Sequence, residues 1–215
     1  MQIFWIILRQ EFTLAGKNLG KVLQNFLFFF ISLSVFFLIS QNNISQGNSS
    51  ESLINATLFC LIFSLIFSNS DFLHEDVIIS QPNLEVYIFA RMLGNWLIFS
   101  FPILLSLPLV SVIIGLNQNV AQDFTILTIL ASLTINFICA FCGSLGVAQN
   151  KSPMIAILAM PLVIPILLIA CGNFSGGESS AEIFSSSLKI LSGICIFVGS
   201  ICVLATAKIM KIISE

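Results

Sequence analysis

Long apolar runs separated by short polar links dominate this sequence and restrict the folds that are open to it. Six runs have about the 20 residues that a helix needs to cross a hydrocarbon core about 30 Å thick. With 57% hydrophobic and 8% charged residues in 215, the chain has more apolar area than a soluble domain could cover with polar side chains. The sequence therefore predicts an all-α, polytopic membrane protein.

The start of the chain, residues 1–21, differs from the runs that follow. Its apolar side chains recur at near-helical spacing, with polar side chains elsewhere around the helix: Phe4, Trp5, Leu8 and Phe12 against Gln2, Arg9, Gln10, Lys17 and Lys21. This pattern is typical of an amphipathic helix that lies flat at the membrane interface. A signal peptide fits less well, because the next apolar run is too long and no Ala-x-Ala pattern follows it.

We expect residues 1–215 to form a single transmembrane domain in which the interfacial helix precedes six membrane spans. The spans are predicted over residues 22–40, 53–69, 92–116, 124–147, 153–172 and 188–207. The first polar link, residues 41–52, contains no Lys or Arg, whereas the other end of the first span is basic. By the positive-inside rule, the chain therefore starts on the cytoplasmic side.

The remaining basic residues agree with this topology. One side of the membrane receives seven of them and the other side only Lys189; the seven are Arg9, Lys17, Lys21, Arg91, Lys151, Lys208 and Lys211. Both termini are thus expected in the cytoplasm, or in the matrix if the membrane is mitochondrial. We predict a multi-pass protein of the bacterial inner membrane or of the mitochondrial inner membrane.

Several functional classes lack their usual motifs here. No G-x-x-x-x-G-K-[ST] loop occurs, so any energy from nucleotide hydrolysis would come from a partner. No cluster of Lys and Arg suits nucleic acid. The spans hold almost no ionisable residues, which argues against a proton-coupled carrier or a self-sufficient channel. No arrangement of nucleophile, base or paired carboxylates supports an enzyme.

The candidate ligand residues have simpler interpretations. Cys139 and Cys142 form a C-x-x-C pair, but they lie in a predicted span among small residues, which favours helix packing over redox or metal chemistry. His74, the only histidine, is interpreted as a solvated or interface residue. Thr134 and Asn136 can hydrogen-bond to a neighbouring helix. We therefore predict no catalytic, cofactor-binding or metal-binding residue in this chain.

Prolines interrupt two of the predicted spans. Pro102 and Pro108 are expected to kink the third span, because proline removes a backbone donor. Pro161 and Pro165 lie four residues apart in the fifth span, on one face of a helix. Two interpretations stay open for this pair: a kinked span, or a broken helix that lines a conduit or a partner groove.

Residues 71–91 form the polar interruption that differs most from its surroundings. The segment holds four of the ten acidic residues, the only histidine and the only tyrosine, between two long apolar runs. We expect a cytoplasmic loop, with a short helix lying across the membrane face, that docks on a separate soluble subunit.

At several places the sequence resembles the B subunit of the cytochrome c maturation system, often called haem exporter protein B, an ABC-2-like permease. The resemblance rests on residues 151–172 with their Met-Pro-Leu-Val-Ile-Pro core, on residues 101–110 with Gly115, on residues 143–147, and on the cluster Phe72, Glu75 and Asp76. The number of spans and the order of these motifs agree along essentially the whole chain.

The resemblance implies a function and partners. The chain would be the permease subunit that couples ATP hydrolysis by an ABC ATPase subunit to haem export or to release of a haem-loaded chaperone. Other partners would be cytochrome c maturation membrane subunits, membrane lipid and a second copy of the chain. Haem would be handled by the complex, with no cofactor bound by this chain. The alternative is a general ABC-2-type exporter permease for a lipid or small amphiphile.

The resemblance also points to site residues. Phe72 would be the apolar anchor on the ATPase, and Glu75 and Asp76 the charged rim of that contact. Pro161 and Pro165 would form a helix-breaking motif on the external side. Residues 76–84 contain no glycine and are shorter than the family's segment, so nothing further is carried over from that stretch.

Overall fold

The computed structural model describes residues 2–17, 19–41, 49–68, 84–148, 154–174 and 181–214. All regular secondary structure in these ranges is helical, which confirms the predicted all-α class for this part of the chain. The helices are α1 (Gln2–Lys17), α2 (Leu19–Gln41), α3 (Ser49–Ser68), α4 (Leu84–Phe99), α5 (Phe101–Ile114), α6 (Gln118–Ala148), α7 (Met154–Cys171), the short 3-10 helix η4 (Gly172–Phe174) and α8 (Ala181–Ser214).

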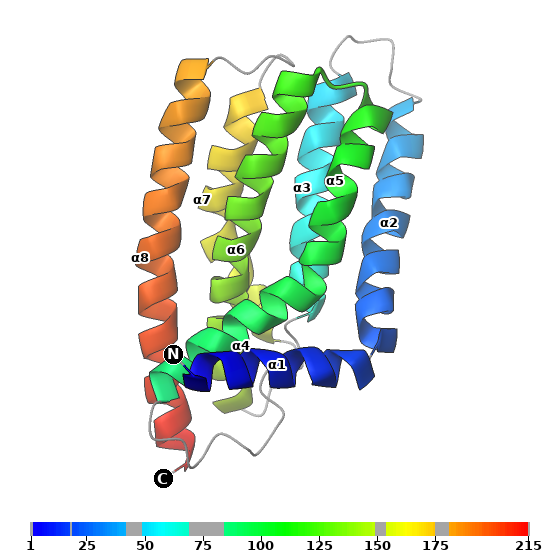
Figure 1. Cartoon of the computed structure of the whole chain (residues 1–215). Coiled ribbons are helices and arrows are strands. Elements are labelled where there is room, and N and C mark those ends of the chain that lie inside the picture. The colour runs from blue at the N-terminus through cyan, green and yellow to red at the C-terminus, as the bar shows by residue number, and fades with distance from the viewer. Residues whose placement is uncertain are drawn as a thin grey trace.

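The helices form an upright bundle with two crosswise helices at one end (Figure 1). α2, α3, α5, α6, α7 and α8 stand side by side, whereas α1 and α4 lie across the lower end of the bundle in this view. The last turns of α8 lie at the same end as α1. The chain thus begins and ends its described part at the end where the crosswise helices lie.

Three of the described helices are long and apolar enough to cross a membrane: Leu19–Ile39 in α2, Gln118–Gly146 in α6 and Ile183–Ile212 in α8. α4 and α5 pass the same test together as a bent pair, which raises the number to up to four. α3 and α7 contain the shorter apolar helices Ser52–Ile66 and Leu158–Cys171. A multi-pass membrane protein follows, while the predicted total of six spans stays a prediction.

The third predicted span, residues 92–116, belongs to two helices that meet at Ser100 with a bend of 40°. Pro102 in the first turn of α5 explains the bend, because it has no N–H to donate to the preceding turn and its ring crowds the residue before it. The kink expected from Pro102 is confirmed. Pro108 lies inside α5, which continues through it as one helix.

Several helices extend beyond the predicted apolar runs. α4 begins inside the predicted loop 71–91, and α8 covers more than the predicted residues 188–207. α6 begins at Gln118, before the predicted start of the fourth span at residue 124. Once a helix is nucleated, each further residue adds a hydrogen bond, so helices continue past the end of the apolar run into polar sequence.

A tight turn at Gly115 joins α5 to α6. Gly115 has φ 80° and ψ 31°, a left-handed conformation that glycine adopts without steric cost. The Leu116 N–H donates to the Ser111 carbonyl at 3.0 Å, which caps the end of α5. The turn is short enough to bring α5 and α6 directly back alongside each other.

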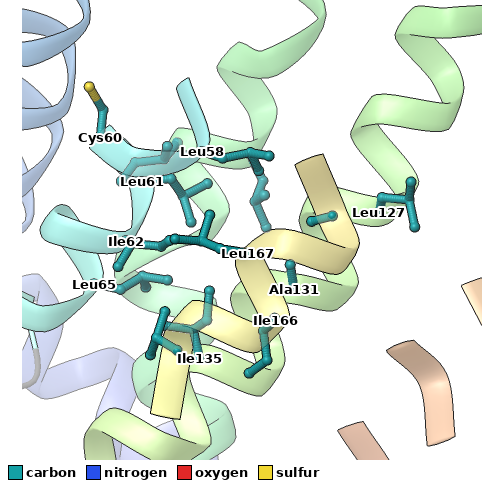
Figure 2. Close-up of a cluster of buried hydrophobic side chains, with 14 of the residues drawn as sticks. Leu58, Cys60, Leu61, Ile62, Leu65, Leu127, Ala131, Ile135, Ile166 and Leu167 are labelled. Atoms are coloured by element: carbon teal, nitrogen blue, oxygen red, sulfur yellow. The ribbon is translucent and has the colours of Figure 1, made fainter. Parts of the chain in front are cut away.

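The main core lies between α3, α6 and α7 (Figure 2). Buried aliphatic side chains from the three helices meet there, namely Leu58, Leu61, Ile62 and Leu65 of α3, Leu127, Ala131 and Ile135 of α6, and Ile166 and Leu167 of α7. Because lipid is as apolar as these side chains, their close fit rather than exclusion of water holds these helices together.

A second core lies at the end of the bundle where α1 and α4 cross it. Ile7 of α1 and Ile88 and Met92 of α4 belong to one buried cluster with Phe137 of α6 and Val203 of α8. The crosswise helices are therefore packed against the bundle rather than lying separate from it.

Gly199 of α8 lies close to the Phe137 side chain of α6. A Cβ built on Gly199 would lie 3.2 Å from the ring of Phe137, whereas a Cβ on Gly193 of the same helix would meet nothing within 4 Å. Phe137 is buried, and its ring stacks on that of Phe89 with centroids 6.3 Å apart, so it has little freedom to move away. Gly199 thus permits the spacing of α6 and α8.

We predict that Gly199→Leu destabilises the protein, whereas Gly193→Leu does not. Overpacking against Phe137 should lower the free energy of unfolding by about 1–3 kcal/mol. Leucine at the open site should leave it unchanged or raise it by up to about 1 kcal/mol through helix propensity. Thermal unfolding in detergent measures both, and equal melting temperatures for the two variants would contradict the close packing described here.

Candidate functional site

Seven polar or amphipathic side chains from α1, α4 and α6 meet where these helices cross. We call this cluster the polar junction; its members are Glu11, Tyr87, Arg91, Asn95, Trp96, Ser132 and Asn136. Polar side chains are expensive in a lipid-embedded bundle unless they are paired, so such a cluster needs a structural or functional reason.

The ion pair between Glu11 and Arg91 joins α1 to α4. Arg91 Nε lies 3.5 Å from Glu11 Oε1, and the side chains are only 8% and 18% exposed for Arg91 and Glu11, respectively. The Arg91 guanidinium also donates from Nη1 to the Tyr87 hydroxyl at 3.4 Å. A charge removed from water to this extent is strongly destabilising without its partner, so the pair fixes α1 in one position on α4.

Gly94 allows this contact to form. A Cβ built on Gly94 would lie 3.3 Å from both Cβ and Cγ of Glu11. The glycine therefore lets the Glu11 side chain pass close to the α4 backbone, within reach of Arg91.

One turn further along α4, amide side chains continue the junction to α6. Asn136 Nδ2 donates to the Met92 carbonyl at 2.9 Å, and Asn95 Nδ2 donates to Asn136 Oδ1 at 3.4 Å. Asn136 is fully buried. Its predicted role in linking neighbouring helices is confirmed, whereas Thr134 bonds to the Leu130 carbonyl of its own helix.

Trp96 extends the junction by one more contact. Its indole Nε1 donates to Ser132 Oγ at 3.1 Å, and that hydroxyl in turn donates to the Ile129 carbonyl at 2.8 Å. The helical spacing of residues 87, 91 and 95 on α4 and of residues 132 and 136 on α6 gives each helix one polar stripe. The two stripes face each other, and Glu11 of α1 lies at one end.

Aromatic rings follow the same path beside the polar contacts. The ring of Phe4 in α1 lies 6.3 Å from that of Phe89 in α4, which stacks on Phe137 of α6. Phe137 in turn lies beside Gly199 of α8, where a Cβ would be 3.2 Å from its ring. Polar and aromatic contacts together tie the two crosswise helices to α6 and α8.

Comparison with known proteins assigns the chain to a family. A family model described as CcmB protein matches residues 2–213. The chain belongs to the CcmB protein family. It is 22% identical over 218 residues to "Heme exporter protein B" of Haemophilus influenzae, with 98% of each chain covered. It is 24% identical over 178 residues to "Heme exporter protein B" of Pseudomonas aeruginosa, with 79% of each chain covered.

The site residues predicted for this CcmB family member fall in two places. Phe72, Glu75 and Asp76, together with His74, lie outside the described residues, in the stretch just before α4. Pro161 and Pro165 lie in α7, and both are exposed. α7 continues as one helix from Met154 to Cys171 through both prolines, and their role as a helix-breaking external motif stays a prediction.

The thiols predicted to be packing residues are part of the helix core. Cys139 and Cys142 are buried, unpaired with each other or with another cysteine, and belong to the main core. Among the residues that the structure describes, no group of three or more His, Cys, Asp or Glu side chains is placed to hold a metal ion. The interpretation of these cysteines as small apolar side chains fits their positions.

The pairing of Glu11 with Arg91 was missed by sequence reasoning. The sequence does contain a signal, because Glu11 is the only acid before Glu51, and Arg91 is the only basic residue between Lys21 and Lys151. In a chain so poor in charge, a single acid and a single base at the ends of apolar runs are candidates for a pair.

We predict that Glu11→Gln destabilises the CcmB chain more than Glu85→Gln, which removes an exposed acid from α4. The first change removes the Glu11 carboxylate from its contact with Arg91, and the free energy of unfolding should fall by about 1.5–3 kcal/mol. Chemical unfolding in detergent measures the loss. In a double-mutant cycle, Arg91→Gln should cost less in the Glu11→Gln background, and additive losses would contradict the pair.

A separate prediction concerns the amide pair. Asn136→Leu should lower the free energy of unfolding by about 1–3 kcal/mol, because the buried Met92 carbonyl and the Asn95 amide lose this partner. Thr134→Val serves as the control, since the Thr134 hydroxyl donates to the Leu130 carbonyl of its own helix. Thermal unfolding compares the two variants. An equal change in melting temperature would contradict a stabilising link between α4 and α6 through Asn136.

Proposed function

We propose that this chain is the membrane-embedded permease subunit of an ABC-type complex that exports haem for cytochrome c maturation. The observation that carries the proposal is the CcmB family match over residues 2–213 of a chain with several candidate membrane spans. Relatives that align with 79% and 98% of this chain bear the name "Heme exporter protein B". ATP would be hydrolysed by a partner subunit, because the sequence has no phosphate-binding loop of that type.

The proposed topology has six spans with both termini on the cytoplasmic side. The upright helices α2, α3, α5, α6, α7 and α8 would cross the membrane, and α1 would lie at its cytoplasmic interface. The arrangement in Figure 1 supports this, because α1 and the last turns of α8 lie at one end. Arg9 lies in α1, Lys21 in the first turn of α2, and Lys208 and Lys211 in the last turns of α8, as the positive-inside rule requires of the cytoplasmic side.

The stretch before α4 would be the contact with the ATPase subunit. Phe72 would supply an apolar anchor, and Glu75 and Asp76 a rim that orients the partner by charge. α4 supports this assignment, because it follows this stretch directly and lies across the proposed cytoplasmic end of the bundle. A movement of the ATPase would therefore reach α4 first.

The polar junction would transmit that movement. α4 is joined to α1 by the Glu11–Arg91 pair and to α6 by Asn136, and it bends by 40° into α5. Hydrogen bonds and ion pairs have preferred geometries, so helices linked by them move together or exchange partners rather than sliding freely. ATP-driven closure of the partner would shift α4, α1 and α6 as one unit.

Haem would be the cargo of the complex rather than a resident cofactor of this chain. The sequence offers a single histidine, His74, in the proposed ATPase contact. Other membrane subunits of the system and a haem chaperone would hold the haem, while this permease would deliver the force for export or for release of the loaded chaperone.

Co-purification tests the proposed contact. The triple variant Phe72→Ala, Glu75→Lys, Asp76→Lys should lose most of the ATPase subunit during affinity purification of the chain from membranes. Glu178→Lys with Glu182→Lys is a matched control, because these acids belong to the proposed external side. Unchanged ATPase recovery with the triple variant would remove the stretch from the interface.

A deletion strain tests the proposed cargo. Deletion of the chain should abolish cytochrome c maturation, which haem staining of membrane proteins measures. Intact cytochrome c together with a changed export of lipid or small amphiphiles would instead support the general exporter.

A further inference from the structure

We propose that the outward face of α1 binds the phosphate group of anionic phospholipids, with Arg9 as the cationic contact and Trp5 and Phe12 as flanking anchors. The proposal rests on the interfacial position of α1 in the topology given above. It adds a lipid partner of defined charge to a helix whose other face is already occupied by α4.

α1 has two faces of different character. Its inward face carries Ile7, which is 5% exposed, and Glu11, which pairs with Arg91. Its outward face carries Trp5 and Phe12, which are 68% and 49% exposed. Exposed aromatic side chains, Trp above all, are typical of the membrane interface.

Arg9 lies between the two aromatic side chains on the outward face. Residues 5, 9 and 12 follow the i, i+4, i+7 spacing of a single helix face, and Arg9 is exposed. A guanidinium between two aromatic side chains suits the boundary of a bilayer, where the rings sit at the level of the headgroups and the cation reaches phosphate oxygens.

The depth of α1 follows from α2. α1 ends at Lys17, and α2 begins at Leu19 and stands upright in the bundle (Figure 1). α2 passes the test for a membrane span, and its first turns expose Leu19 and Leu23. Because α1 leaves the edge of this span crosswise, it must lie at the boundary between hydrocarbon and headgroups.

Charge favours an anionic lipid over a neutral one. The only acid of α1, Glu11, is turned inward and paired with Arg91. On the described outward face of α1, Arg9 therefore carries its charge without an acidic neighbour from the same helix. Anionic headgroups attract such a residue by about 1 kcal/mol, which corresponds to roughly fivefold enrichment.

The exposed side chains of the next helix favour lipid over a protein partner. Leu19, Leu23, Leu27 and Ile31 of α2 are 48–66% exposed along a helix long enough to span a membrane. Lipid can cover the exposed apolar side chains of both helices.

Fluorescence quenching by brominated phospholipids tests the proposal on the full chain in nanodiscs. The fluorescence of the Trp5→Phe variant comes from Trp96 alone. Subtracting it from the fluorescence of the unchanged chain gives the Trp5 signal. Brominated phosphatidylglycerol should quench Trp5 more strongly than brominated phosphatidylcholine at the same lipid fraction. Arg9→Gln should reduce the enrichment of anionic lipid by roughly fivefold. Lys208→Gln, which removes an exposed base from α8, should leave it unchanged.

Each other outcome overturns the proposal. Equal quenching by the two lipids, or a preference that Arg9→Gln does not alter, would exclude a phosphate contact at Arg9. The absence of quenching by either lipid would show that Trp5 does not contact the bilayer, and would indicate a protein on the outward face of α1. The haem export function is judged separately by ATPase recovery and cytochrome c maturation, which this measurement does not use.

Discussion

The ion pair between Glu11 and Arg91 fixes the position of α1 on α4, and much of the surrounding arrangement depends on it. Arg91 is almost fully buried, so it needs a countercharge at close range. Glu11 can supply it only if α1 lies crosswise against α4, near the backbone at Gly94. The same contact turns the acid of α1 inward and leaves the opposite face with Arg9, Trp5 and Phe12 exposed.

Beyond this pair, specificity in the bundle comes from a few polar atoms and two close backbone approaches. Apolar side chains gain little from meeting each other when lipid is an equally apolar alternative. The hydrogen bonds of Asn136 and Trp96 and the contact of Gly199 with Phe137 select one arrangement of α4, α6 and α8 among many of similar packing. Each of these contacts is therefore individually important for the arrangement of the helices.

The helical class and the membrane setting could be predicted from the length of the apolar runs alone. The helix boundaries could not be predicted in this way. Backbone hydrogen bonding extends α6 and α8 beyond the ends of their apolar runs. The Pro102 kink was predictable from proline chemistry, whereas Pro161 and Pro165 lie in a helix that accommodates them without a break. Glu11 and Arg91 are isolated charges in a charge-poor sequence, which marks them as candidates, but they are far apart in the chain and only the packing of α1 on α4 shows that they meet.

The short connection at Gly115 has a mechanical consequence for the opposite end of the molecule. Only three residues, Gly115–Asn117, separate α5 from α6, and Gly115 is locked by its cap. These two helices cannot draw apart at that corner. If the ATPase partner displaces α4, as proposed above, the adjoining ends of α5 and α6 would therefore have to move together.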